Sequence, residues 1–162
     1  MHYGGEQEQL CQCISSLLFC LIYNVPTGEA YGHFGLINFF TMTYCRLRVN
    51  GLCYYNGYGC YCGLGGSGTP VDGIDRCCME HDKCYGEAVT KGGCLFEIQQ
   101  YLARYHYVCI RHRPYCLKAK NNPCRQWICE CDRAAVNCFA KYPLPTTKPI
   151  CKDANTTTTP LW

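Results

Sequence analysis

One short segment of the chain gathers side chains that could do chemistry together. Residues 77–85 have the sequence CCMEHDKCY, in which His81 and Asp82 are adjacent and cysteines stand on both sides. Adjacent side chains on a helix point about 100° apart, so His81 and Asp82 cannot pair with each other and each needs its own partner. Cys77 and Cys78 lie one helical turn earlier, where they can pin the helix while His81 and Asp82 face a common cavity.

A zinc site is the main alternative interpretation of this Cys and His cluster. It would need thiolates, whereas the cysteine content of the chain favours disulfides. No second paired set of Cys or His ligands stands at zinc-binding spacing. We therefore interpret the cysteines as covalent bridges.

A glycine-rich segment upstream could bind a cation. Residues 61–68 have the sequence YCGLGGSG, and glycines at this density let successive carbonyls turn inward, as a hard cation that prefers oxygen donors requires. One carboxylate could complete the site, and Asp82 is the nearest candidate. A phosphate-binding loop would need a lysine that is absent here, and Gly66-Ser67-Gly68 lacks the spacing of a nucleophile elbow. On the loop alone, a plain flexible turn stays open.

Composition bounds the class of protein. The chain has 162 residues and 18 cysteines, above the roughly 8–10 % that marks a disulfide scaffold in a short secreted chain. This argues against a cytosolic enzyme. The formal charge of +3 is too small for a dedicated nucleic-acid binder. The length allows one domain with a real core and argues against a second full domain.

The N-terminal segment also indicates secretion. Residues 13–25 have the sequence CISSLLFCLIYNV, too short for a transmembrane helix of about 20 residues but suited to the core of a secretory signal. Gly28 and Ala30 supply the small residues that cleavage before Tyr31 would need. The usual positively charged start is missing, so a misassigned start and a buried N-terminal helix remain alternatives.

Apolar spacing, glycines and prolines divide the rest of the chain into expected elements. The long helix expected over 72–89 carries His81 and Asp82, and Asp72 is expected to cap its start. We expect a short helix over 36–44, a loop over 51–70, long helices over 72–89 and 125–142, and a loop with a short hairpin over 95–122.

Two segments together point to a known family. YGCYCGLGGSGTPVDGIDRCCMEHDKCY (58–85) and CECDRAA (129–135) resemble the secreted, calcium-dependent phospholipase A2 family, and the bridge pattern resembles its pancreatic-type (group I) members. Both motifs are highly specific, and the resemblance covers about residues 35–151. It implies a mainly α, disulfide-rich fold with an N-terminal helix, a calcium-binding loop, two long antiparallel helices and a small β-wing.

The resemblance implies a domain division and a secreted, extracellular protein. A signal or pro segment would cover 1–34, the phospholipase A2 domain 35–151 and a Thr-rich tail 152–162. Asn155 in the tail begins a glycosylation sequon, which is consistent with secretion. Because no basic residue precedes Gly35, a zymogen step is not indicated.

The resemblance also implies one calcium ion per active site. The carbonyls of Tyr61, Gly63 and Gly65 and both oxygens of Asp82 would hold the ion. The calcium ion and the amide of Gly63 would stabilise the oxyanion.

The implied catalytic residues lie on the two long helices and between them. His81 would act as general base on the attacking water, and Asp132 would fix the tautomer of the His81 imidazole. Tyr85 and Tyr105 match phenols that hydrogen-bond the aspartate in the family.

Family connectivity implies seven bridges and leaves Cys53 over, either buried or paired with another chain. Cys11, Cys13 and Cys20 would leave with the leader. The implied bridges are 45–109, 60–151, 62–78, 77–138, 84–131, 94–124 and 116–129.

The expected substrate surface is a phospholipid membrane. Leu36, Ile37, Phe39 and Phe40 would line the entrance of the acyl-chain channel and the membrane-facing rim, whereas Phe139 is interpreted as core. Ile37 stands where many members carry Trp, which predicts weaker adsorption to zwitterionic bilayers.

The implied function is hydrolysis of the sn-2 ester of glycerophospholipids to a fatty acid and a lysophospholipid. The alternative is a catalytically weak or silent relative that acts as a toxin or receptor ligand. Silent relatives typically lose the histidine or the calcium carboxylate, whereas His81, Asp82, Gly63 and Asp132 are all present.

Overall fold

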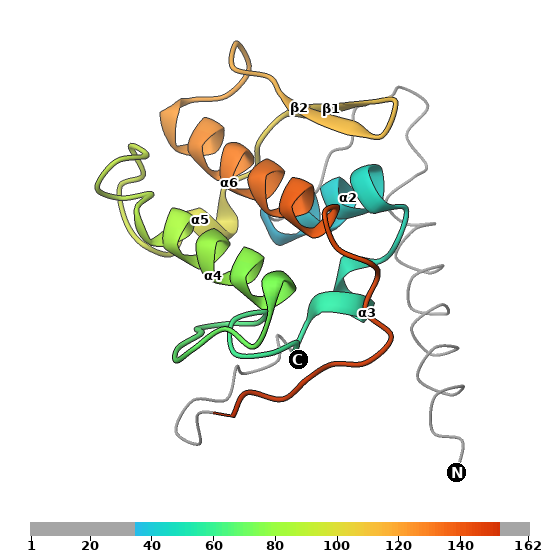
Figure 1. The fold of residues 1–162 in the computed structure, drawn as a ribbon. Coiled ribbons are helices and arrows are strands. Elements are labelled where there is room, and N and C mark those ends of the chain that lie inside the picture. Colours follow the sequence, from blue (N-terminus) through green and yellow to red (C-terminus); the bar gives the residue numbers. More distant parts are fainter. Residues whose placement is uncertain (1–34, 153–162) are drawn as a thin grey trace.

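The computed structural model describes residues 35–152, which form a mainly helical fold with one small sheet (Figure 1). The predicted leader and Asn155 lie outside these residues. In chain order the elements are α2 (Gly35–Leu47), α3 (Gly51–Tyr55), α4 (Gly73–Gly86), α5 (Gln99–Leu102), β1 (Tyr107–Ile110), β2 (Arg113–Cys116) and α6 (Pro123–Phe139). The predicted fold class is confirmed.

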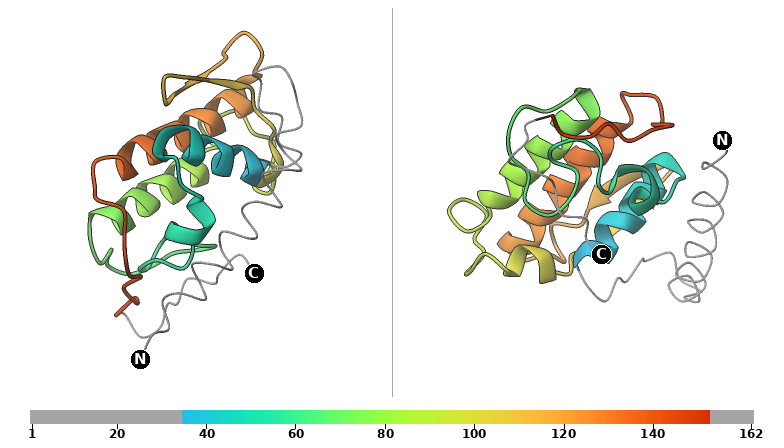
Figure 2. Two further views of the ribbon diagram at one scale, coloured as in Figure 1. Left: turned by 90° about the vertical axis from the view of Figure 1, so that its right-hand side faces the viewer. Right: turned by 90° about the horizontal axis from the view of Figure 1, so that it is seen from below.

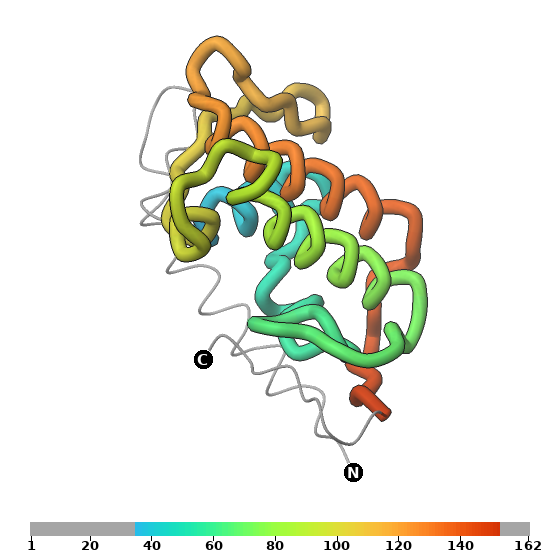
Figure 3. The backbone as a smooth tube through the Cα atoms, turned by 90° about the vertical axis from the view of Figure 1, so that its left-hand side faces the viewer, coloured from blue at the N-terminus to red at the C-terminus, as the bar shows by residue number. Residues whose placement is uncertain are grey.

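The two long helices, α4 and α6, lie side by side and antiparallel at the centre of the molecule (Figures 1 and 3). Asp72 caps α4 as predicted, because its side chain accepts a hydrogen bond from the amide of Asp75 at 3.0 Å. Asn122 caps α6 in the same way, and Pro123 follows in the first turn, where its missing N–H costs nothing. Helix α4 ends at Gly86, short of the predicted Val89.

Helix α2 packs against α6, and α3 leads from it to the glycine-rich loop (Figures 1 and 2). The predicted loop over 51–70 is wrong at its start, because Gly51–Tyr55 forms the short helix α3. The Asn50 side chain accepts from the amide of Leu52 at 3.1 Å and caps this helix.

The predicted hairpin is β1 and β2, which pair antiparallel from Tyr107↔Cys116 to Ile110↔Arg113. Arg111 and His112 form the two-residue turn, both with positive φ (50° and 61°), as tight hairpin turns require. The hairpin packs on α2 and α6. The short helix α5, inside the same predicted loop, was not expected.

Seven disulfide bonds hold these elements together, and their pairing matches the implied connectivity in every case. Cys53, which the family connectivity leaves over, is disulfide-bonded as well. The seven described pairs are 45–109, 60–151, 62–78, 77–138, 84–131, 94–124 and 116–129.

Two apolar clusters fill the space around the helix pair. One contains the fully buried Met42, Ile128 and Val136, and the other contains Tyr55 and Phe139, so the interpretation of Phe139 as core holds. Between residues 35 and 152, no helix combines the length and the apolar character that crossing a membrane would take.

Candidate active site

His81 on α4 faces Asp132 on α6 across the helix pair. His81 Nε2 lies 2.6 Å from Asp132 Oδ1, and the aspartate is completely buried. The disulfide Cys84–Cys131 joins the same two helices one turn beyond His81 and directly beside Asp132. The two catalytic candidates, far apart in sequence, therefore belong to one cross-linked unit.

Two buried phenols complete the surroundings of Asp132. The hydroxyl of Tyr85 donates to Oδ1 at 2.8 Å, and the hydroxyl of Tyr105 donates to Oδ2. Burial, with the nearby charge of Asp132 as the next cause, raises the pKa of both phenols well above the ordinary value. Both phenols therefore stay protonated donors at physiological pH.

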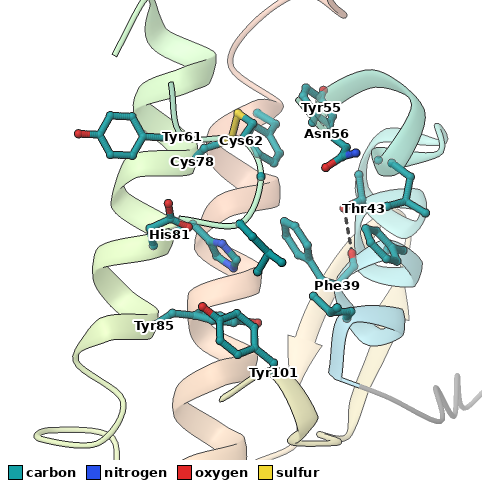
Figure 4. Close-up of a pocket in the computed structure, with 18 residues that line it drawn as sticks. Phe39, Thr43, Tyr55, Asn56, Tyr61, Cys62, Cys78, His81, Tyr85 and Tyr101 are labelled. Atoms are coloured by element: carbon teal, nitrogen blue, oxygen red, sulfur yellow. Dashed lines mark hydrogen bonds between the residues drawn. A yellow bond between two sulfur atoms is a disulfide. The ribbon is translucent and has the colours of Figure 1, made fainter. Parts of the chain in front are cut away.

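The ring of His81 is held between two aromatic side chains. Phe39 stacks on it with 4.7 Å between the ring centroids and 13° between the planes, and Tyr85 lies tilted at 4.3 Å. With Nε2 occupied by Asp132, Nδ1 is the ring nitrogen left for a reactant. Figure 4 shows the imidazole at the wall of the pocket, between α4 and Phe39.

The pocket in front of His81 is mostly apolar and draws its lining from α2, α3, the glycine-rich loop, α4 and α6 (Figure 4). Leu36, Phe39 and Phe40 line it as expected, whereas Ile37 does not. Tyr55 and Phe139 stack on each other at 4.3 Å and also contribute to the lining. Such a lining suits an apolar ligand whose reactive group lies against His81.

Asp82 points at the glycine-rich loop and lines the same pocket. Its Oδ2 is buried without a hydrogen-bond partner, and the Gly66 amide donates to its carboxyl group. Burial raises the pKa of Asp82 to about 6, partly offset by His81. A buried carboxylate oxygen without a partner is costly, and a cation beside it would remove that cost.

The loop opposite Asp82 has a backbone that only glycine permits. Gly65 has a φ of 66°, and a Cβ at Gly66 would lie 2.7 Å from Tyr61 Cα and 2.8 Å from the Cys60 carbonyl oxygen. The Tyr61 hydroxyl donates to the Gly68 carbonyl at 2.7 Å and closes the loop. The Gly63 amide donates to the Tyr61 carbonyl at 2.9 Å.

These observations fit a hard cation with oxygen ligands. Within residues 35–152 no three His, Cys, Asp or Glu side chains converge in a metal-binding arrangement, so main-chain oxygens would supply most ligands. One carboxylate plus loop carbonyls is the donor set that calcium prefers and zinc does not. Of the predicted ligand residues, Tyr61, Gly63 and Asp82 line the pocket, and Gly65 lies in the exposed part of the loop.

Asp75 supports this loop and was missed by the sequence analysis. It is completely buried in the first turn of α4. Its carboxylate accepts from the amides of Cys60, Tyr61 and Val71 at 2.8, 2.8 and 2.9 Å. An aspartate in a first helical turn is ordinary, so no local signal marks it as a loop anchor.

Comparisons with known proteins agree with this geometry. The family described as Phospholipase A2 matches residues 36–149. "Phospholipase A2" of Oryctolagus cuniculus is 50% identical over 100 residues, 60% of this chain and 69% of the relative. "Basic phospholipase A2" of Micrurus mipartitus is 45% identical over 67% of this chain and 87% of the relative. "Phospholipase A2" of Bos taurus is 41% identical over 78% of this chain and 89% of the relative.

Proposed function

The chain belongs to the phospholipase A2 family, and from this premise we propose that it is a calcium-dependent enzyme that hydrolyses the sn-2 ester of glycerophospholipids at membrane surfaces. The products are a fatty acid and a lysophospholipid. The observation that carries the proposal is one pocket in which His81, oriented by Asp132, stands beside the partnerless carboxylate oxygen of Asp82.

His81 is the general base of this proposal. With Nε2–H donating to Asp132, the lone pair of Nδ1 accepts a proton from water while the water oxygen attacks the ester carbonyl. The charge of Asp132 stabilises the imidazolium that results. When the ester C–O bond breaks, His81 returns the proton to the leaving lysophospholipid oxygen. Because water is the nucleophile, no acyl-enzyme forms.

Asp82 and the carbonyls of Tyr61, Gly63 and Gly65 would hold the calcium ion. When bound, the ion supplies positive charge to the carbonyl oxygen that becomes an oxyanion. The Gly63 amide is the proposed second donor to that oxygen. Because it donates to the Tyr61 carbonyl in the structure, it has to exchange this contact for the oxyanion during the reaction.

The test is hydrolysis of a glycerophospholipid labelled at its sn-2 chain, with calcium and with excess chelator. We expect label release with calcium, none with chelator, and loss of at least about a thousandfold in His81→Gln. Asp82→Asn should abolish calcium binding, measured by titration calorimetry, and leave the disulfide framework intact. Full phospholipid hydrolysis in excess chelator, or by a folded His81→Gln protein, would refute the mechanism.

The alternative is a toxin or receptor ligand without catalysis. The presence of His81, Asp132 and Asp82 together argues against this alternative. Hydrogen bonds hold the imidazole ring and both carboxylates in defined positions. Binding to a cell-surface receptor that persists in the inactive His81→Gln protein would instead support a second, non-catalytic role.

We also propose an extracellular protein in which a leader over 1–34 precedes the domain 35–151. The sequence of the N-terminal segment and seven disulfides support this. Intact mass and N-terminal sequencing of the protein collected from culture medium would test it.

A further inference from the structure

Two buried side-chain oxygens in the lining of the pocket have no hydrogen-bond partner among residues 35–152. One is Oδ2 of Asp82, which the proposed function assigns to calcium, and the other is Oδ1 of Asn56. The proposed mechanism gives Asn56 no task. A buried amide oxygen without a donor is costly, so Asn56 marks a place where a ligand that brings a hydrogen-bond donor gains binding energy.

Other polar groups of the lining are already engaged. The hydroxyls of Thr43 and Tyr61 donate to main-chain carbonyls at 2.9 and 2.7 Å. The hydroxyl of Tyr85 donates to Asp132 at 2.8 Å. Asn56 therefore offers an unused, buried acceptor in a lining that is otherwise mostly apolar.

Asn56 directly follows α3 and meets a different part of a ligand than His81 does. Figure 4 shows Asn56 beside Tyr55 on the α3 side of the pocket, across from His81. Leu52 and Tyr55 on α3 line the pocket around it, and such a surface suits hydrocarbon better than a charged headgroup. With the ester against His81, the part of the substrate that reaches Asn56 is therefore the acyl chain.

Main-chain contacts hold Asn56 in a fixed place. The ammonium group of Lys148 donates to the Asn56 carbonyl at 2.7 Å. The amide of the next residue, Gly57, donates to the Cys62 carbonyl at 2.6 Å, and the disulfide Cys62–Cys78 ties this point to α4. An acceptor that is already positioned loses little freedom when a ligand binds to it.

We propose that Asn56 is a specificity-determining residue that selects phospholipids whose sn-2 acyl chain carries a hydroxyl group. The hydroxyl donates to Asn56 Oδ1 while the ester lies against His81. A hydroxyl also accepts from an amide nitrogen, so it pairs with either face of the Asn56 amide. An unsubstituted chain leaves the buried oxygen unpaired, and this penalty is the source of the discrimination. The inference rests on the proposed function, because it names the substrate class of the same pocket.

The experiment is a competition assay with the full-length protein and calcium in mixed detergent micelles. Phosphatidylcholines with the same sn-1 chain carry at sn-2 either stearoyl or one of a series of hydroxystearoyl isomers, in which the hydroxyl moves stepwise along the chain. Because all substrates share one micelle surface, differences in adsorption cancel. Mass spectrometry of the released acids gives the ratios of kcat/KM.

Two variants are compared with the unchanged protein. Asn56→Leu keeps a side chain of similar size and removes the amide. Thr43→Val is the matched control, because it removes a polar group that packs against Gly51 at the start of α3 and whose hydrogen is already donated. Asn56→Ala replaces Asn56→Leu if the latter does not fold.

We expect the unchanged protein to hydrolyse at least one hydroxystearoyl isomer about tenfold faster than the stearoyl substrate. The preference should disappear in Asn56→Leu and stay within about twofold in Thr43→Val. The inference is overturned if no isomer is preferred, as expected where a bound water satisfies the amide instead. It is also overturned if both variants lose the preference equally.

A binding measurement separates failure of this inference from failure of the proposed function. Hydroxystearic and stearic acid compete with a fluorescent fatty acid for the pocket, in the unchanged protein and in Asn56→Leu. Absent hydrolysis of every substrate would refute the proposed function. The inference would still be decided by whether the hydroxylated acid binds more tightly and loses this advantage in Asn56→Leu.

Discussion

The carboxylate of Asp75 on α4 accepts a hydrogen bond from the main-chain amide of Tyr61 at 2.8 Å, and this contact joins the helix that carries His81 to the loop that faces Asp82. The same carboxylate accepts from Cys60 and Val71, so one buried charge organises both ends of the loop. Three amide donors compensate a charge that would otherwise be costly to bury.

Replacement of Asp75 should therefore damage the loop and the fold together. In Asp75→Asn the amide nitrogen faces main-chain donors, and we expect a loss of about 2–4 kcal/mol in the free energy of unfolding. Calcium affinity should fall by at least about tenfold, because the loop carbonyls lose their fixed positions. Urea unfolding with intact disulfides and calcium titration measure the two effects.

Gly59→Ala gives an independent test of the same contact. Gly59 has a φ of 62°, and a Cβ there would lie 2.5 Å from Asp75 Oδ2. We expect it to weaken calcium binding in the same direction although Asp75 is unchanged. Normal calcium affinity in both variants would contradict the role assigned to Asp75.

The stack of Phe39 on His81 predicts a kinetic effect of a residue that does no chemistry. Phe39→Ala removes the ring that stacks on the His81 imidazole. We expect kcat to fall by about tenfold because the imidazole loses its fixed orientation. The cost in stability should be about 2–4 kcal/mol. Phe40→Ala is the control, because Phe40 lines the same pocket without a ring contact to His81. Equal losses of kcat in both variants would argue against a positioning role for Phe39.

The buried phenols predict a loss of stability in alkali. Burial raises the pKa of Tyr55 to about 12 and those of Tyr85 and Tyr105 well above 10, whereas all three titrate near 10 when unfolded. Their contribution is therefore complete below pH 10 and declines as pH rises above it, because the unfolded chain releases these protons first. Urea unfolding at pH 9 and pH 11 should show the decline, and Tyr85→Phe should make it smaller. Phenolate absorbance that titrates as a single step near pH 10 in the folded protein would refute this.

Removal of the disulfide Cys84–Cys131 should lower kcat more than removal of Cys116–Cys129, although the two should cost similar stability. Replacing both cysteines with serine opens a loop of sequence separation 47, against 13 for Cys116–Cys129. Chain entropy predicts similar costs of about 3–4 kcal/mol for the two bridges. Only the first bridge joins the helices beside His81 and Asp132, so we expect kcat to fall much further when it is removed. Measured under conditions where both variants are folded, equal kcat values would show that the bridge does not position the pair.

Local pattern was enough to predict much of this molecule. Closely spaced glycines permit the positive φ angles of the loop, and Asp72 and Pro123 mark where the long helices begin. Both features can be predicted from sequence because helix caps and positive φ angles depend on a few neighbouring atoms. The specific motifs extended this to the fold, the seven disulfides and the residues that meet in the site. The short helices α3 and α5 escaped prediction because each has too few residues to show a period.

What remained was decided only in three dimensions. Asp75 has the local sequence of an ordinary first-turn aspartate, and it becomes a loop anchor because folding brings three amides to it and removes water. The stack of Phe39 on His81 and the exposure of Leu95, Phe96, Ile98 and Leu102 likewise depend on how α2 and α5 pack around the helix pair. The sequence by itself determined which chemical groups are present and where the chain turns. The tertiary structure decided which groups are buried and which stay in water, because burial depends on residues distant in the chain.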